Sequence, residues 1–364
     1  MKRGITSLPL HTGKAPRWLF QRMTRLAGAI AELVIREKGA AEFLRRIADP
    51  VWFQAFGCVV GFDWHSSGVT TTLCGALKEG LASVSDLPIA VCGGKAARGR
   101  ATPEEISRYS SAWQIDDRSF VETSRMCAKI DNSLLQDGFS IYHHTFMFTP
   151  SGEWAVVQQG LNGESKTARR YQWFSRDNLD LFSDPHSGIT CDSRADILNL
   201  VASESKDTRA AAVDFVSNDP DDMMRTWKRV ALSMPKRHYI TPADLDERRL
   251  SRVFRILHES DSETYRDIVG TRGVGPKTLA ALALVSELVY EAPPSFSDPA
   301  RFSFAHGGKD GHPFPVDRKT YDRTIESLHL CLDRARIGDR EKIDAFRRLS
   351  RYDETAFPKT SGDA

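Results

Sequence analysis

The sequence predicts an α+β domain over residues 1–190, followed by an all-α domain over residues 191–364. Before residue 190, the alternating segments FSIYHHTFMF and EWAVVQQG indicate two strands, and the TPSG between them is typical of a hairpin turn. From about residue 193 onward, nearly every segment has helical periodicity, with short breaks at SNDPDD, SMPKRHYITPAD and APPSFSDP. A length of 364 residues also suits two or three domains.

The N-terminal domain is expected to open with helices. Apolar residues recur at steps of three and four between residues 15 and 48, and Pro50 ends a second short helix. The apolar run VWFQAFGCVVGF predicts a buried strand that delivers DWHSSG at its end. Further helices are expected at GVTTTLCGALKEGLA, at TPEEISRYSSAW and over residues 118–135, and a short strand at LPIAVCGG. Thr102 is expected to cap the TPEEISRYSSAW helix, with Glu105 completing a capping box.

Composition and charge exclude several classes of protein. No apolar run approaches the roughly 18 residues of a spanning helix, and the first residues lack the apolar segment of a secretory signal. A cytoplasmic protein with no membrane partner is therefore expected. The six cysteines include no close pair, which argues against a structural zinc site. Net charge is only +2, but residues 223–258 carry nine Lys/Arg against three Asp/Glu, a balance that favours a phosphate-bearing partner.

Residues 261–290 have the pattern of a helix-hairpin-helix. The glycines on either side of Val274 would let the backbone turn sharply and approach a phosphate with no Cβ in the way. Pro276 suits the first turn of the second helix, whose amides and positive end attract an anion. The predicted DNA contacts are Gly273, Val274, Gly275, Pro276, Lys277 and Thr278. Such a device holds a nucleic-acid backbone without reading its bases.

The N-terminal domain supplies the unusual polar residues. Asp63 and His65 lie two residues apart in DWHSSG, so at the end of a strand both side chains would face the same way. Strand alternation groups His144 with aromatic residues, as a hydrogen-bonded core histidine, and leaves His143 as the candidate for chemistry. The segments AKIDNS and ARRYQW add Lys129, Asp131, Arg169 and Arg170.

Carboxylates and imidazoles suit a divalent cation, Mg²⁺ or Mn²⁺, that activates water against a phosphodiester. The candidate metal ligands are Asp63, His65, Asp131 and His143. Lys129, Arg169 and Arg170 would face the phosphates and stabilise developing charge. The alternative is that these are buried polar groups satisfied by hydrogen bonds, together with an arginine–aromatic patch that stacks on single-stranded bases.

Several segments together resemble a known family. They are KAPRWLF, GFDWHSSG, GALKEGL, YHHTFMF, WAVVQQGLN, ARRYQW, GVGPKT and FAHGGKDGHPFPVDR. The set is similar to the bacterial and archaeal domain-of-unknown-function family number 763, from about residue 10 to residue 350. The resemblance implies a helix-hairpin-helix protein with a role on DNA, and it assigns no catalytic residue.

The favoured function is a metal-dependent, structure-selective nuclease that acts on single-stranded or branched DNA in repair or recombination. A first alternative is a DNA glycosylase or abasic-site lyase, because the hairpin resembles that of helix-hairpin-helix glycosylases. In that case Lys277 matches their Schiff-base lysine and Asp317 their assisting aspartate. A second alternative is a non-catalytic binder of branched or single-stranded DNA. RNA would satisfy the same phosphate contacts.

Overall fold

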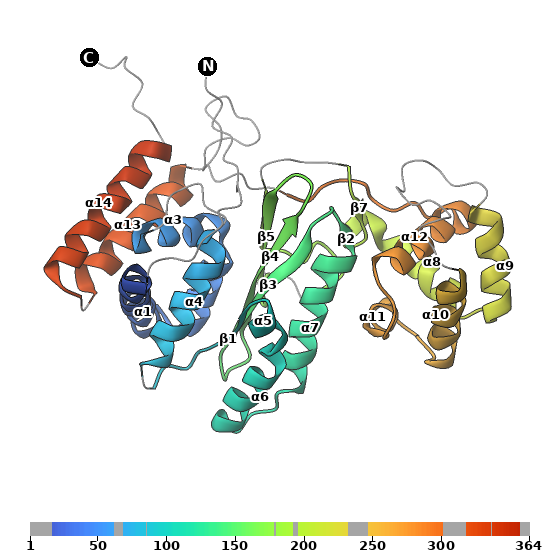
Figure 1. Ribbon diagram of the computed structural model, residues 1–364, viewed down its shortest axis with the longest axis horizontal. Coiled ribbons are helices and arrows are strands. Elements are labelled where there is room, and N and C mark those ends of the chain that lie inside the picture. Colours follow the sequence, from blue (N-terminus) through green and yellow to red (C-terminus); the bar gives the residue numbers. More distant parts are fainter. Residues whose placement is uncertain are drawn as a thin grey trace, which may run out of the picture.

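A five-stranded antiparallel sheet lies at the centre of the protein, with helices on both faces (Figure 1). The computed structural model describes residues 17–61, 68–84, 86–177, 180–191, 196–231, 247–300, 318–335 and 337–356. The strands lie in the order β1-β3-β4-β5-β6. They are β1 (Ala90–Lys95), β3 (Ser140–Phe148), β4 (Trp154–Asn162), β5 (Thr167–Phe174) and β6 (Gly188–Thr190). The predicted hairpin of two alternating strands is confirmed as β3 and β4.

Alternation along the strands divides the buried residues into two hydrophobic cores. Phe146, Phe148 and Trp173 point toward one face of the sheet and belong to the larger core. Met147 and Phe174, their immediate neighbours in sequence, point toward the other face and belong to the second core. Consecutive side chains of a pleated strand lie on opposite faces, so each strand contributes to both cores.

The second core is covered by a layer of helices from both ends of the chain (Figure 1). Its elements are α1 (Arg17–Lys38), α2 (Ala40–Ala48), α3 (Pro50–Val60), α4 (Gly68–Ala82), α13 (Arg318–Arg334) and α14 (Asp339–Ala356). Helices α1 and α4 approach closely where Gly28 contacts Gly80. A Cβ on Gly80 would lie 2.6 Å from the carbonyl oxygen of Thr24, so a larger residue would not fit there. Helices α13 and α14 pack against α1 and α3.

The strand predicted at VWFQAFGCVVGF is wrong, because that run forms helix α3. Asp49 caps the helix by accepting hydrogen bonds from the amides of Val51 and Trp52, and Pro50 occupies the first turn. Nearly every residue of α3 is buried, so the segment has no polar face and no readable period. An Asp-Pro start was the local signal for a helix.

The opposite face of the sheet is covered first by α5 (Ala97–Arg100), α6 (Thr102–Trp113) and α7 (Arg118–Ser133). The predicted capping box of α6 is wrong. Thr102 lies inside the helix and donates to the carbonyl of Gly99, and Glu105 instead forms an ion pair with Lys78 of α4 at 2.6 Å. Glu105 also accepts from the amide of Gly93, so it connects α6 to the first strand and to the helical layer beyond it.

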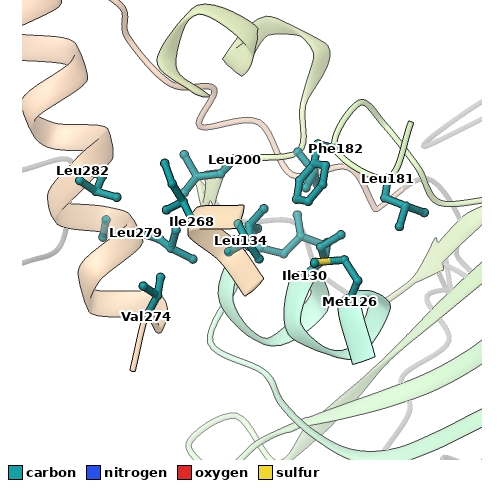
Figure 2. Packing of buried hydrophobic residues seen from close by; sticks show 14 of the residues in the cluster. Met126, Ile130, Leu134, Leu181, Phe182, Leu200, Ile268, Val274, Leu279 and Leu282 are labelled. Carbon is teal, nitrogen blue, oxygen red and sulfur yellow. The ribbon is translucent and has the colours of Figure 1, made fainter. Parts of the chain in front are cut away.

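The remaining helices extend the larger core away from the sheet (Figure 2). In Figure 2, Val274, Leu279 and Ile268 lie on the same side of α7 as Leu134. The elements are β2 (Leu135–Gln136), β7 (Leu198–Asn199), η1 (Ser203–Ser205), α8 (Lys206–Val216), α9 (Pro220–Ala231), α10 (Glu247–Glu259), α11 (Tyr265–Gly270) and α12 (Pro276–Tyr290).

The packing does not divide near residue 190. One core runs without a break from β3 and α7 through α8 to α12, so the helices after residue 190 share their interior with the sheet. Helices α13 and α14 lie at the other end of the molecule, against the N-terminal helices (Figure 1). The protein is therefore a mixed α+β structure, in which α8 to α12 extend the larger core and α13 and α14 belong to the second core. None of the described helices has the length and apolar character needed to cross a bilayer.

Candidate nucleic-acid interface

A tight turn joins α11 to α12. Thr264 and Asp267 cap the start of α11 reciprocally, and the chain then turns through residues 271–275 into α12. Gly273 has a φ of 95°, a left-handed conformation that glycine adopts without strain. Val274 is buried and anchors the turn to the core. Lys277 and Arg272 are exposed on either side of it.

Gly275 differs from Gly273 in its backbone conformation. Its φ of −142° is extended backbone that any residue adopts, and a Cβ built there would meet nothing within 4 Å. Neither strain nor packing within the described protein therefore calls for a glycine. No side chain caps α12 at Gly275, and the first-turn amides of an α-helix have no intrahelical acceptor. The start of this 15-residue helix can consequently receive an anion close to the backbone.

Two polar side chains from the body of the protein hold the turn in place. The Lys129 ammonium of α7 donates to the carbonyl oxygen of Thr271 at 3.0 Å. The Gln136 side-chain amide of β2 donates to the carbonyl oxygen of Pro276 at 2.8 Å. Burial lowers the pKa of Lys129. Lys129, predicted as a catalytic residue, thus contacts the backbone of the α11–α12 turn.

Helix α10 lies beside the turn, and its outer face is basic. The side chain of Val253 lies 3.7 Å from the position that a Cβ on Gly273 would occupy. The buried stripe of α10 contains Leu250, Phe254 and Leu257 in addition to Val253. Arginines fill much of the exposed face, and α9 adds further exposed cations. They are Arg248, Arg249, Arg252 and Arg255 on α10, and Arg225, Lys228 and Arg229 on α9.

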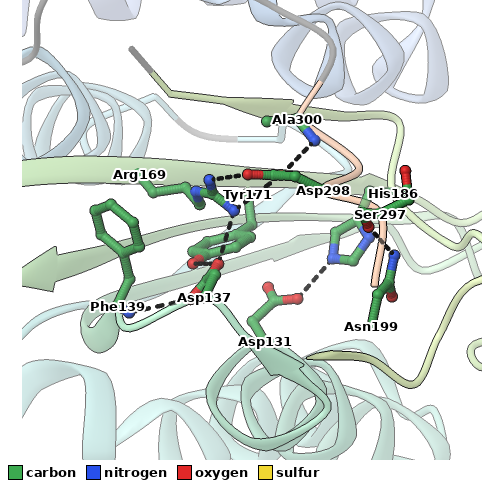
Figure 3. Close-up of polar contacts among 10 residues, drawn as sticks. All are labelled: Asp131, Asp137, Phe139, Arg169, Tyr171, His186, Asn199, Ser297, Asp298 and Ala300. Atoms are coloured by element: carbon green, nitrogen blue, oxygen red, sulfur yellow. Dashed lines mark hydrogen bonds and ion pairs between the residues drawn. The ribbon is translucent and has the colours of Figure 1, made fainter. Parts of the chain in front are cut away.

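Asp131, one of the predicted metal ligands, lies at the centre of a buried hydrogen-bond cluster, and Figure 3 shows its bond with His186. Its carboxylate accepts from His186 Nε2 at 2.6 Å, from the indole of Trp173 at 3.0 Å, and from the Gln158 amide. Burial raises the pKa of Asp131, and its bonds with these three residues oppose that rise. Both carboxylate oxygens of Asp131 therefore already have protein donors.

The cluster continues through His144 in one consistent direction of donation. The Gln158 carbonyl oxygen can only accept, so His144 Nδ1 donates to it at 3.0 Å. His144 Nε2 is then the acceptor, and the Ser124 hydroxyl donates to it at 2.8 Å. Burial lowers the pKa of His144 to about 4. The prediction that His144 is a hydrogen-bonded core histidine is confirmed.

Arg169 lies on the same face and is buried between two carboxylates (Figure 3). It contacts Asp137 at 3.0 Å and Asp298 at 2.7 Å, and the Tyr171 hydroxyl donates to Asp137 at 2.7 Å. Arg169 is 1% exposed, so its guanidinium links β5 to the segment around residue 298 and does not face solvent. In this conformation no phosphate can reach it.

A second polar row crosses the opposite face of the sheet. His143, Gln159, Arg170 and Thr190 occupy directly paired positions on four adjacent strands. All four are buried. The Arg170 guanidinium donates to the Gln54 side chain and does not face solvent, where a phosphate would lie. His143 Nε2 bonds to the Thr145 hydroxyl, while His143 Nδ1 has no partner among the described residues. Burial lowers the pKa of His143 to about 3.

The predicted metal ligands do not converge. Asp131 bonds to Gln158 on the α7 face of the sheet, whereas His143 pairs with Gln159 on the α2–α4 face, so the two cannot bind one ion. Asp63 and His65, and also Asp317, lie outside the described residues. Within the described parts of the chain, no group of three or more His, Cys, Asp or Glu side chains is placed to hold a metal.

His186 and Asp298 belong to these buried networks but were not predicted from the sequence. Each lies in an irregular segment rich in Ser, Asp and Pro, SDPHSG and SFSDP, where no periodicity draws attention to one polar residue. The role of each residue depends on a partner that is distant in sequence. Asp131 lies 55 residues from His186, and Arg169 lies 129 residues from Asp298. No local signal could have identified them.

The chain belongs to DUF763, a family described as proteins of unknown function, whose sequence model matches residues 4–316. This confirms the resemblance found in the sequence motifs. No curated protein and no solved structure gave a significant match.

Proposed function

We propose that this DUF763 protein binds DNA by gripping the sugar–phosphate backbone with the α11–α12 turn, used as a helix-hairpin-helix. The observation that carries the proposal is Gly275, which neither φ nor packing explains in the described protein, at the uncapped start of a long helix. A closely approaching phosphate supplies the missing reason, since a side chain there would keep it from the amides.

The surroundings of the turn have the charge that such contact needs. Exposed Arg272 and Lys277 flank the turn, and the basic face of α10 lies next to it. Contacts of this kind neutralise phosphates without reading base edges. Binding should therefore be insensitive to sequence and should weaken steeply as salt rises. Single-stranded or branched DNA is the proposed partner, and RNA would meet the same contacts.

The test replaces Gly275 by serine. Serine is a favoured N-cap, so Gly275→Ser should leave the thermal stability unchanged or slightly higher. Its hydroxyl would occupy the amides proposed for the phosphate, so DNA affinity should fall on the order of tenfold. Gly163→Ser is the control, because Gly163 is exposed and a Cβ there, as at Gly275, meets nothing within 4 Å.

Fluorescence anisotropy with a labelled oligonucleotide would measure the two variants beside the wild type and Lys277→Ala. Equal DNA affinity for Gly275→Ser and wild type, with both folded, would contradict the proposed contact. Loss of binding in Gly163→Ser as well would show that the effect is not local to the turn.

Metal-dependent cleavage of DNA is a second candidate function, in a narrower form than the sequence suggests. One observation favours it: the chain segment with Asp63 and His65 joins α3 to α4, and both helices pack on the sheet face that carries His143. The His143 Nδ1 atom is buried there without a partner among the described residues. This narrower candidate leaves out Asp131, which bonds to three donors on the other face of the sheet.

Incubation of forked and single-stranded DNA with Mg²⁺, Mn²⁺ or EDTA would test this second candidate. Cleavage should require the metal and should be lost in Asp63→Ala and in His143→Ala. Binding without cleavage under both metals would contradict it. A borohydride-trapped protein–DNA adduct that disappears in Lys277→Ala would instead indicate the lyase chemistry, since only a Schiff base is trapped by that reagent.

A further inference from the structure

A cavity of about 380 Å³ opens between the first turn of α8, the start of α11 and the segment from Asp180 to Phe182. Its volume falls within the range of small-ligand sites, roughly 300–1,000 Å³. Tyr265 and Phe182 form an aromatic wall, with their rings edge to face at 5.7 Å. Lys206, Arg209 and Arg266 contribute three cations, against a single carboxylate, Asp180, among the lining residues.

Arg209 has the most unusual environment of these cations. It is 7% exposed, and one terminal nitrogen, Nη1, donates to the carbonyl oxygens of Leu200 and Ala202 at 3.0 and 2.8 Å. No carboxylate forms a direct ion pair with it among the described residues, but the nearby charges of Asp180 and Asp184 oppose the effect of burial on its pKa. Burial lowers the pKa of Arg209. A buried guanidinium without a direct ion pair favours an anion beside it.

The other two cations, Lys206 and Arg266, differ in whether they already form an ion pair. Lys206 is exposed at the rim of the cavity and forms no ion pair with a described residue. Arg266 forms an ion pair with Glu122 of α7 at 2.7 Å. The lining of the cavity thus has about one positive charge in excess, because Lys206 and Arg209 are opposed by Asp180, and the ion pair of Arg266 with Glu122 is neutral. A phosphate monoester offers three strong acceptor oxygens, so it can accept from Lys206 and from Arg209 at the same time.

The cavity and the α11–α12 turn lie at opposite ends of the same helix. Helix α11 has six residues, so its length is about 9 Å at 1.5 Å per residue. One DNA strand advances about 3.4 Å per nucleotide along the duplex axis. A strand held at the turn would therefore reach the cavity after about three nucleotides.

We propose that this cavity binds the terminal phosphate monoester of a DNA strand whose backbone lies on the α11–α12 turn. The inference rests on the proposed DNA binding, and it gives that function a substrate class, phosphorylated strand ends. Lys206 and Arg209 hold the phosphate oxygens, and the Tyr265–Phe182 wall packs against the terminal sugar or base.

The experiment compares short single-stranded oligonucleotides that carry a 5′-phosphate, a 3′-phosphate or hydroxyls at both ends. The full-length wild type should bind one phosphorylated form about tenfold more tightly than the hydroxyl form, through charge-assisted hydrogen bonds. Lys206→Ala and Arg209→Lys should remove most of that preference, so that the phosphorylated and hydroxyl forms bind with similar affinity. Lys38→Ala, an exposed lysine at the end of α1, is the control that should keep the preference.

The outcomes separate the two proposals. Equal affinity for all three oligonucleotides, with DNA binding intact, would overturn the end-binding pocket and leave the turn as a DNA contact. A preference that persists in both Lys206→Ala and Arg209→Lys would place end recognition elsewhere and also overturn it. Absence of binding to any oligonucleotide would overturn the proposed DNA binding and this inference together.

Discussion

The two faces of the sheet carry polar rows of similar composition that differ in how completely they are hydrogen-bonded. On the α7 face, His144, Gln158 and Asp131 form a continuous chain of donors and acceptors. On the α2–α4 face, His143 Nδ1 and the Thr190 hydroxyl are buried without a partner among the described residues. A buried polar group without a partner costs about 1–3 kcal/mol, so a fold keeps one only where another requirement applies.

The contrast shows that polar burial alone does not locate a functional site. The α7-face network uses its hydrogen-bonding capacity to fix α7 and the segment around residue 298 to the sheet, which is a structural role. The α2–α4 face retains unused capacity, and it is therefore the better place to look for chemistry. Three further measurements would test these assignments.

The largest effect is expected from Arg169→Met. The substitution would leave Asp137 and Asp298 buried without their shared cation, and breaking such a pair costs about 3–5 kcal/mol. Chemical denaturation would measure the loss in the free energy of unfolding. Arg118→Met is the matched control: its pair with Asp116 is exposed, so little change is expected there. Similar stability for both variants would contradict the structural role of the network.

An intermediate effect is expected from pH acting on His144. Its pKa is about 4 in the folded protein and 6.5 unperturbed, so the unfolded state binds the proton first as pH falls. The contribution of His144 to stability is present above pH 6.5 and is lost progressively toward pH 4. At pH 5 the loss amounts to about 2 kcal/mol.

His144→Gln keeps a donor and an acceptor but removes the titration. Its free energy of unfolding should fall less between pH 7 and pH 5 than that of the wild type, and titrations common to both proteins cancel in the difference. Parallel pH profiles would mean that His144 is not neutral and buried as described.

The smallest effect is expected from Lys129→Ala. This change removes one hydrogen bond to the carbonyl of Thr271, worth about 1 kcal/mol. Because that bond holds the α11–α12 turn, DNA affinity should fall about threefold at unchanged salt dependence, since the lysine itself meets no phosphate. A reduced salt slope would instead indicate that Lys129 contacts the DNA directly.

Features that depend only on residues close together in sequence could be predicted from the sequence alone. Alternation in FSIYHHTFMF specified a strand and the opposite faces of His143 and His144, because pleating is a local property of the backbone. The spacing of Gly273, Val274 and Pro276 specified a turn between two helices for the same reason. The family, too, could be identified from motifs alone.

The packing contacts between these elements could be known only from the tertiary structure. The apolar run of α3 fits a buried strand or a buried helix equally well, because it has no polar face to reveal a period. Packing also placed α13 and α14 on the N-terminal helices, put Asp131 and His143 on opposite sides of the sheet, and buried Arg169 between two carboxylates. Burial and pairing depend on residues far away in the sequence, and no local pattern encodes those partners.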